Sequence, residues 1–82
     1  MVELYQMEHC PYCAKVRMAM EEMDIDFIAR NVPKGSLKRK FLVALGGKEQ
    51  VPFLVDTDNP AAPVTMYESD DIISYLKEKY AR

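Results

Sequence analysis

Two cysteines, Cys10 and Cys13, are the residues of this 82-residue chain best suited to chemistry, and the chain contains no others. They follow an apolar segment, residues 2–7, and stand at the start of a helical pattern. A helix N-terminus offers unpaired backbone N–H groups and the positive end of the helix dipole, which both favour a thiolate. Cys13 lies one helical turn after Cys10, close enough to form a small disulfide ring with it. The pair therefore predicts a reversible dithiol–disulfide centre, as in a thiol–disulfide oxidoreductase.

The segments around this pair alternate between strand and helix patterns. Residues 2–7 carry apolar side chains on both faces, which is typical of a strand covered on both sides. We expect a helix over residues 12–23, with Pro11 in its first turn, where a missing N–H costs little. Arg17 and Glu21 are spaced to pair on the outer face of this helix. Further strands are expected over residues 27–32, 51–56 and 64–67, and further helices over about 36–45 and from residue 69 onwards.

This order of elements predicts the topology. A strand–helix–strand start implies a parallel pair with a right-handed crossover, and the short connection between the last two strands implies an antiparallel hairpin. We therefore predict an α/β fold with a four-stranded mixed sheet flanked by three helices, in the order βαβαββα, as a single domain over residues 1–82. Cys10 then emerges at the C-terminal end of a strand, where open α/β sheets bind their ligands.

The two later helices have apolar stripes and recognisable ends. The stripes are Leu37, Phe41, Ala44 and Leu45 in the second helix, and Ile72, Ile73 and Leu76 in the last helix. Gly46 and Gly47 are expected to end the second helix. Ser69 is expected to cap the last helix, with Asp70 and Asp71 in its first turn, where they match the helix dipole.

Composition and charge exclude several classes of protein. The net charge of −2 gives no sign of nucleic-acid binding, which favours a basic surface. No apolar run reaches the ~18 residues of a membrane span, and the N-terminus does not resemble a secretory signal. Two closely spaced cysteines also staple a secreted domain poorly. We therefore expect a cytoplasmic monomer without a nucleic-acid or membrane partner.

A metal site is not expected. Structural zinc takes four ligands, whereas the chain has two cysteines and one histidine. A dimer that pools its ligands is the alternative left open.

The motifs Cys10-Pro11-Tyr12-Cys13, Val51-Pro52 and Glu68-Ser69-Asp70-Asp71, in this order of elements, resemble the glutaredoxins of the thioredoxin-like fold. The last of these motifs, with the run from Ile72 to Leu76, is also similar to the N-terminal glutathione-binding domain of glutathione transferases. Both families bind the same tripeptide, so both resemblances imply glutathione as co-substrate and glutathionylated or disulfide-containing proteins as partners.

The resemblance implies a role for each matching residue. Cys10 is implied to be the nucleophile and Cys13 the resolving thiol, with Pro11 supporting them. Pro52 is implied to be a cis proline whose preceding residue, Val51, pairs through its backbone with the cysteinyl part of glutathione. Tyr12 is implied to pack against the tripeptide, while Ser69 and Asp70, supported by Glu68, hold its γ-glutamyl end.

Physical arguments support some of these roles and leave alternatives open. A helix N-terminus suits a carboxylate, and Asp70 suits an ammonium group, but the same residues also make a helix cap without any ligand. The glycine carboxylate of glutathione needs a cation, for which Lys38, Arg39 and Lys40 are all candidates. The alternative is that these three residues form a solvent-exposed helix face that binds no ligand.

Met7 departs from the glutaredoxin pattern, in which many members carry a lysine three residues before the first cysteine. A cation there would lower the pKa of Cys10, whereas Glu8 would raise it. We therefore expect the helix N-terminus, or His9 when charged, to stabilise the thiolate.

Three other readings remain open. The chain is also compatible with a partner-specific redoxin that a flavoprotein reductase reduces, or with a glutathione-binding or iron–sulfur carrier module of little catalytic activity. Relatives that carry clusters usually lack a proline after the nucleophile, so Pro11 argues against the last. A detached N-terminal domain of a transferase-like protein is the third reading.

Overall fold

The computed structural model describes residues 1–80, so residues 81–82 of the predicted domain lie outside the described part. The elements are β1 (Val2–Gln6), α1 (Pro11–Glu22), β2 (Phe27–Asn31), α2 (Arg39–Gly46), β3 (Phe53–Asp56), β4 (Val64–Met66) and α3 (Ser69–Lys79). This order confirms the predicted βαβαββα arrangement. Within residues 1–80, no helix has the length and apolar character needed to span a membrane.

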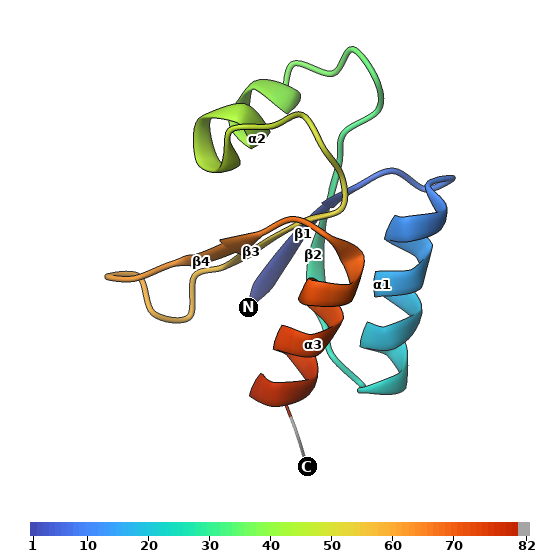
Figure 1. Cartoon of the computed structure of the whole chain (residues 1–82), viewed down its shortest axis with the longest axis vertical. Coiled ribbons are helices and arrows are strands. Elements are labelled where there is room, and N and C mark those ends of the chain that lie inside the picture. The colour runs from blue at the N-terminus through green and yellow to red at the C-terminus, as the bar shows by residue number, and fades with distance from the viewer. Residues whose placement is uncertain (81–82) are drawn as a thin grey trace.

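The four strands form one mixed sheet in the order β2-β1-β3-β4. β1 pairs in parallel with β2, while β3 is antiparallel to both β1 and β4. Helices α1 and α3 pack side by side against one face of the sheet, and α2 lies on the other side (Figure 1). The sheet therefore separates two layers, as the sequence predicts.

Alternation along β1 explains how the sheet serves both layers. Val2 and Leu4 are fully buried and join the cluster formed with α1 and α3. Tyr5 points to the opposite face and packs against the cluster around Phe53. Successive side chains of a strand point to opposite faces, so one five-residue strand anchors both halves of the core.

The packing of α2 differs from the predicted apolar stripe. Leu42 is fully buried against β3, whereas Leu37, Phe41 and Leu45 are 77%, 60% and 51% exposed. The helix begins at Arg39 and has only eight residues. Leu42 is the one fully buried residue of this short helix, and the apolar side chains of the predicted stripe are exposed to solvent. This exposed stripe is a feature that apolar periodicity alone did not predict.

Gly46 shows why the C-terminus of α2 needs a glycine. A Cβ atom at this position would collide with the Tyr67 ring and hydroxyl. The Tyr67 hydroxyl donates to the carbonyl oxygens of Leu42 (3.2 Å) and Lys48 (2.8 Å) and accepts from the Lys48 N–H. The predicted helix end is confirmed by Gly47, which adopts a left-handed φ of 87°.

The cap of α3 differs from the prediction. Glu68, with a φ of 65°, occupies the N-cap position, and Ser69 is already the first helical residue. The Glu68 carbonyl accepts the N–H of Ile72 at 3.0 Å, which closes the first turn. Ser69 is therefore not the cap but the first residue of the helix.

Candidate functional site

Cys10 lies where the loop after β1 meets α1. It is the N-cap residue of the helix, in an extended conformation, and its Sγ accepts the backbone N–H of Cys13 at 3.4 Å. Pro11 is the first helical residue, where its fixed φ suits the turn and no N–H is lost. Both cysteines are free thiols. The predicted placement of a sulfur at the helix N-terminus is thus present in the structure.

The two thiols have different surroundings. Cys10 is partly exposed, whereas Cys13 is fully buried one turn further along α1. Burial raises the pKa of Cys10, but hydrogen bonds from the N–H and thiol of Cys13 and from the N–H of Tyr12 outweigh it, with help from the Arg17 charge. The net pKa of Cys10 is lowered.

Cys13 shifts in the opposite direction. Burial raises the pKa of its thiol to about 11, and its hydrogen bond to Cys10 adds to the effect. At neutral pH the exposed sulfur is therefore the one that ionises more readily, and the buried sulfur keeps its proton. Only the thiolate is a nucleophile, so Cys10 is the more reactive of the two sulfurs.

Arg17 was not among the residues that the sequence analysis linked to the site. Its guanidinium donates to the side-chain oxygen of Gln6 and to the carbonyl oxygens of Met7 (3.3 Å) and Glu8 (3.0 Å). Its ion-pair partner is the Glu8 carboxylate at 3.9 Å, whereas the expected pairing was with Glu21. Arg17 therefore ties α1 to the loop before Cys10 and places a cation near its sulfur.

Arg39 supplies a second cation on this side of the molecule. Its guanidinium donates to the carbonyl oxygens of Val32 and Glu49 and lies 3.2 Å from the sulfur of Met7. Two arginines from different helices thus converge on the position where glutaredoxins often carry a lysine. The sequence did not reveal this because both are distant from Met7 along the chain.

A polar cleft of about 480 Å³ borders the start of α1, with Tyr12 but neither cysteine among its lining residues. It joins three segments that are far apart in sequence: the start of α1, the bend before β3 and the start of α3. Its lining residues are Tyr12, Lys15, Gln50, Val51, Pro52, Glu68, Ser69 and Asp70. All five residues that the resemblance assigns to glutathione are in this list. We call this hollow the Tyr12–Ser69 cleft.

The walls of this cleft present backbone and side-chain groups in fixed positions. The Val51–Pro52 peptide bond is cis, as the resemblance implied. Ser69 is buried at the N-terminus of α3, where the first backbone N–H groups have no partner within the helix. Tyr12, which also lines the cleft, is 64% exposed. The cleft therefore combines a helix N-terminus, which suits an anion, with an exposed aromatic ring.

Two residues of the cleft were missed by the sequence analysis. Lys15 forms an ion pair with Asp70, and Gln50 donates to the Glu68 carboxylate at 3.0 Å. Lys15 is three residues after Tyr12 and thus on the same helix face, a signal that helical spacing alone contains. The cleft therefore has its own cation next to the carboxylate predicted to bind an ammonium group.

Lys38 lies outside this cleft. It is exposed at the N-cap of α2 and, like Lys40, it is not a lining residue. Arg39 is occupied by backbone carbonyl groups. The prediction that one of these three residues binds the glycine carboxylate stays a prediction. Within residues 1–80, no three His, Cys, Asp or Glu side chains gather in a way that would hold a metal ion.

The fold and the site together define a thioredoxin-like domain with a cysteine at the N-terminus of its first helix. Residues 4–82 match the family described as the glutathione S-transferase N-terminal domain, and the chain belongs to this family. Of the two resemblances in the sequence analysis, this finding confirms the likeness to transferases.

Two curated relatives come from Schizosaccharomyces pombe. Glutathione S-transferase 1 is 35% identical over 79 residues, which is 94% of this chain and 34% of that protein. Glutathione S-transferase 2 is 37% identical over the same share of both chains. The chain therefore spans about a third of the length of these relatives.

Solved structures are similar over the whole chain. A glutathione S-transferase from the Antarctic clam Laternula elliptica superposes with a TM-score of 0.82 at 29% identity, covering 99% of this chain and 36% of that one. A glutathione transferase family member from Pseudomonas fluorescens pf-5, with two glutathione bound, gives 0.83 at 23% identity, covering 99% and 37%. At the latter identity the similarity is one of fold.

Proposed function

We propose that this protein is a glutathione-dependent thiol–disulfide oxidoreductase of the dithiol glutaredoxin kind. The observation that carries the proposal is the position of two free thiols one helical turn apart. Cys10 is partly exposed at the N-cap of α1 with its sulfur accepting the Cys13 N–H, whereas Cys13 is buried. The surroundings lower the pKa of Cys10 and raise that of Cys13 to about 11, in line with this position. This difference fits a nucleophile and a resolving thiol.

Glutathione fits the Tyr12–Ser69 cleft by its chemistry. Its γ-glutamyl carboxylate suits the free N–H groups at the start of α3, and its ammonium group suits Asp70. Its backbone suits the backbone groups of Val51, in the bend before β3, with which an extended peptide can pair. The names of the relatives and the glutathione in the Pseudomonas fluorescens structure support the same ligand.

In the proposed reaction the Cys10 thiolate attacks the glutathionyl sulfur of a mixed disulfide. The bond to the protein sulfur breaks, and that sulfur leaves as a thiolate and takes up a proton. A second glutathione then gives up its thiol proton and attacks the glutathionyl sulfur on Cys10. Oxidised glutathione leaves, and the Cys10 thiolate is restored. For a protein disulfide, the Cys10 thiolate attacks one sulfur and the other leaves as a thiolate that takes up a proton. Cys13 then gives up its proton and attacks the Cys10 sulfur, which forms the ring and releases the second protein thiol. Two glutathione molecules reopen the ring and leave as oxidised glutathione.

The test is reduction of the mixed disulfide of glutathione and 2-mercaptoethanol by the pure protein with glutathione. Wild type and Cys13→Ser are expected to turn over, and Cys10→Ser to be inactive, because only Cys10 forms the covalent intermediate. Equal loss in both variants would contradict the route through Cys10 alone.

The family name makes glutathione transfer to an electrophile a second candidate. The same preparations are therefore assayed with an aromatic chloride as acceptor. Conjugation that survives in Cys10→Ser, with no disulfide reduction by wild type, would favour the transferase. Reduction of the protein by a flavoprotein reductase and NADPH instead of glutathione would favour the partner-specific redoxin.

A further inference from the structure

A second hollow, of about 430 Å³, borders Cys10 away from the residues that line the Tyr12–Ser69 cleft. It lies between the loop after β1 and the connection from β2 to α2. Its lining residues are Gln6, Met7, Glu8, His9, Cys10, Asn31, Val32, Pro33 and Lys34. We call it the Met7–Lys34 cleft. None of these residues lines the first cleft, so the nucleophile stands beside a separate space.

The floor of the Met7–Lys34 cleft is largely apolar or already satisfied. Met7 and Pro33 provide apolar surface above the fully buried Val32. The Gln6 amide donates to the Asn31 side chain at 2.6 Å and accepts from Arg17, so its polar groups have partners. An apolar side chain therefore suits this floor better than a charged one.

The segment of chain that leads from this cleft through α2 is strongly basic; we call residues 27–48 the basic segment. Residues 27–48 carry six Lys and Arg and no Asp or Glu, so all 13 acidic residues lie elsewhere in the chain. Arg30 pairs with Glu3, and Arg39 binds backbone carbonyl groups. Among residues 1–80, the remaining four cations have no ion-pair partner and are exposed; these are Lys34, Lys38, Lys40 and Lys48.

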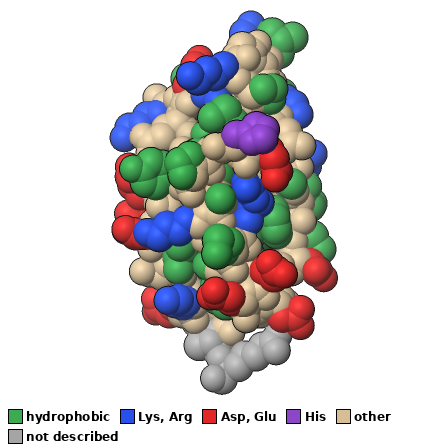
Figure 2. Space-filling model, turned by 90° about the vertical axis from the view of Figure 1, so that its right-hand side faces the viewer, with side chains coloured by type: hydrophobic (Ala, Val, Ile, Leu, Met, Phe, Trp, Pro, Cys, Tyr) green, Lys and Arg blue, Asp and Glu red, His purple; other side chains and the backbone are tan. Residues whose placement is uncertain are grey.

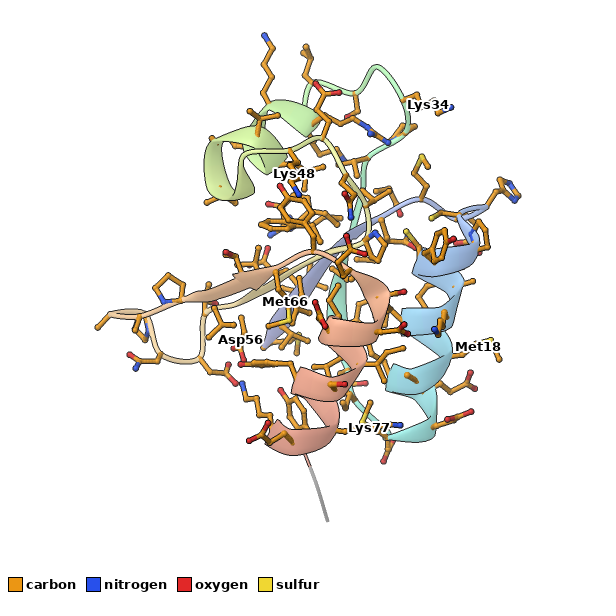
Figure 3. The ribbon with its side chains drawn as sticks, in the orientation of Figure 1. Met18, Lys34, Lys48, Asp56, Met66 and Lys77 are labelled. Carbon is orange, nitrogen blue, oxygen red and sulfur yellow. The ribbon has the colours of Figure 1, made fainter. Side chains whose placement is uncertain are left out.

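Lys34 and Lys77 lie at opposite ends of the molecule. Figure 3 shows Lys34 on the connection above the sheet and Lys77 at the far end, on α3. On the face shown in Figure 2, acidic side chains gather around the lower end of the molecule, with basic ones among them. Leu37, just before α2, and Phe41 within it are exposed apolar side chains of the basic segment. The combined surface is apolar next to the nucleophile, and its exposed charges are cationic apart from Glu8, which pairs with Arg17 at 3.9 Å.

We propose that this surface, from Cys10 across Pro33 and Lys34 to Phe41, binds the protein half of the mixed disulfide and selects acidic partners. The preferred segment carries an apolar residue beside its cysteine and Asp or Glu in the flanks. This inference rests on the proposed function and names its substrate class. When glutathione occupies the Tyr12–Ser69 cleft, the leaving cysteine and its neighbours need a separate place, and the Met7–Lys34 cleft borders the same sulfur.

Complementary charge acts mainly on encounter and on register, and salt screens it. Acidic flanks are therefore expected to raise kcat/KM more than kcat, and the advantage is expected to shrink at high ionic strength. The chemical step is the same for every peptide: the bond between Cys10 and the glutathionyl sulfur forms, and the bond between the peptide and glutathionyl sulfurs breaks.

The test uses the full chain and two glutathionylated peptides of equal length. Both have a central cysteine next to a leucine, and the flanks are glutamate in one peptide and lysine in the other. Wild type is expected to favour the glutamate peptide by roughly fivefold to tenfold in kcat/KM at low salt. Lys34→Glu is expected to abolish or invert this ratio. Lys77→Glu changes charge equally at a distant exposed site and is expected to retain it.

Equal rates for the two peptides, or a preference that survives in Lys34→Glu, would overturn the proposal. The mixed disulfide of glutathione and 2-mercaptoethanol has no protein half and reports the proposed function separately. If that small substrate is not reduced, the surface is tested by binding, with the same peptides carrying serine in place of cysteine. Shifts of the Met7 methyl and His9 ring resonances that favour the glutamate peptide would support the surface, and shifts that do not would reject it.

Discussion

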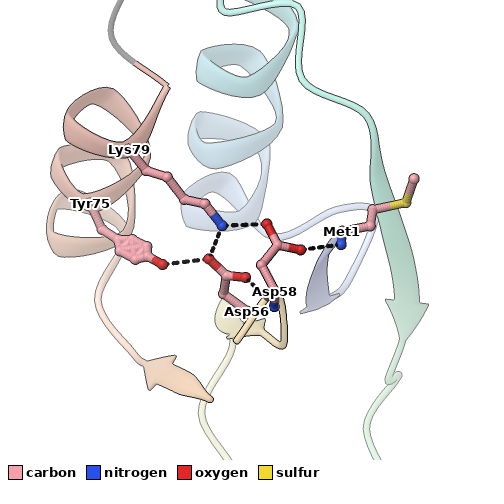
Figure 4. A network of polar contacts seen from close by, with 5 residues as sticks. All are labelled: Met1, Asp56, Asp58, Tyr75 and Lys79. Atoms are coloured by element: carbon pink, nitrogen blue, oxygen red, sulfur yellow. Dashed lines mark hydrogen bonds and ion pairs between the residues drawn. The ribbon is translucent and has the colours of Figure 1, made fainter. Parts of the chain in front are cut away.

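The two ends of the central sheet handle charge in different ways. At one end, where β1 leads to Cys10, the four lysines of residues 27–48 have no ion-pair partner within residues 1–80. The first N–H groups of α3, which border the Tyr12–Ser69 cleft, have no partner within the helix. At the other end, where β3 finishes, Asp56 is 3% exposed and surrounded by donors. The Tyr75 hydroxyl and Lys79 both donate to it, as does the Asp58 N–H at 3.0 Å (Figure 4).

The network around Asp56 continues outward. Lys79 also binds Asp58 at 2.6 Å, and Asp58 accepts from the amino terminus of Met1 at 2.5 Å. The charged groups of this network therefore connect β3, α3 and the residue before β1 through ion pairs. The contrast teaches that this small domain fixes one end by internal pairing and leaves the other end available for ligands.

Asp56→Ala gives the largest expected effect, and it breaks the paired end. The substitution leaves Tyr75 and Lys79 without their shared acceptor in a buried position, so the free energy of unfolding is expected to fall by about 3 kcal/mol. Denaturant titration measures this change. Asp58→Ala is the control and is expected to cost less, because its side chain is 45% exposed. Similar losses in both variants would mean that burial does not distinguish the two carboxylates.

Acid is expected to weaken the same end selectively. Burial opposes ionisation of Asp56, but its hydrogen bonds from Lys79 and Tyr75 prevail and lower its pKa from 3.8 to about 2. A carboxyl group with a depressed pKa stabilises the fold above its unfolded pKa and loses this effect as pH falls through the folded one. A stability loss of about 2 kcal/mol is therefore expected between about pH 5 and pH 2.

Asp56→Asn tests this assignment, because an amide does not titrate. Its free energy of unfolding, starting lower at neutral pH, is expected to vary less between pH 5 and pH 2 than that of wild type. Parallel pH profiles for the two proteins would assign the acid sensitivity to other carboxylates.

Sequence patterns predicted the order and position of the helices and strands better than the contacts between residues. The order of elements, the position of Cys10 at a helix N-terminus and the inward face of α3 follow from local periodicity and caps, and all are present. The outward stripe of α2 was not foreseen, because periodicity identifies a stripe but not which neighbour covers it. Glu68, not Ser69, is the N-cap residue, because the helix begins one residue earlier than expected: the Glu68 carbonyl already accepts the N–H of Ile72.

The residues of the site divide in the same way. Tyr12, Val51, Pro52, Ser69 and Asp70 belong to local motifs, and the structure brings them to one cleft. Arg17 and Arg39 reach the loop before Cys10 from two helices, a contact between segments that only the tertiary fold creates. The sequence led us to expect the helix N-terminus, or His9 when charged, to stabilise the thiolate. The charge that lowers the Cys10 pKa in the structure is that of Arg17, which is not a neighbour of Cys10 in sequence.

Arg17→Met tests how the end of the sheet next to Cys10 uses its charge. Removing the guanidinium takes away a charge that lowers the Cys10 pKa and frees the carbonyl oxygens of Met7 and Glu8. The rate of Cys10 alkylation at neutral pH is expected to fall roughly threefold, an effect of about 0.7 kcal/mol, and its titration curve to move to higher pH.

Arg17→Lys is the matched control for charge. It is expected to retain part of the alkylation rate, since the charge remains but the fork of donors does not. An unchanged titration curve in Arg17→Met would assign thiolate stabilisation to the helix N-terminus and the two thiol contacts alone. A global loss of stability is checked in the same samples by denaturant titration.

Asp70→Asn has the smallest expected effect and tests whether the open end is built for a ligand. Asp70 lines the Tyr12–Ser69 cleft and pairs with Lys15, but both side chains are more than half exposed, so their ion pair contributes little to folding. If Asp70 instead accepts the ammonium group of glutathione, the amide is expected to raise the KM for glutathione roughly threefold with kcat unchanged. Asp71→Asn removes the same charge one residue later, outside the lining of the cleft, and is expected to leave KM as it is. Equal KM values in both variants would show that the general charge of the first turn of α3, and not a contact with Asp70, attracts the ligand.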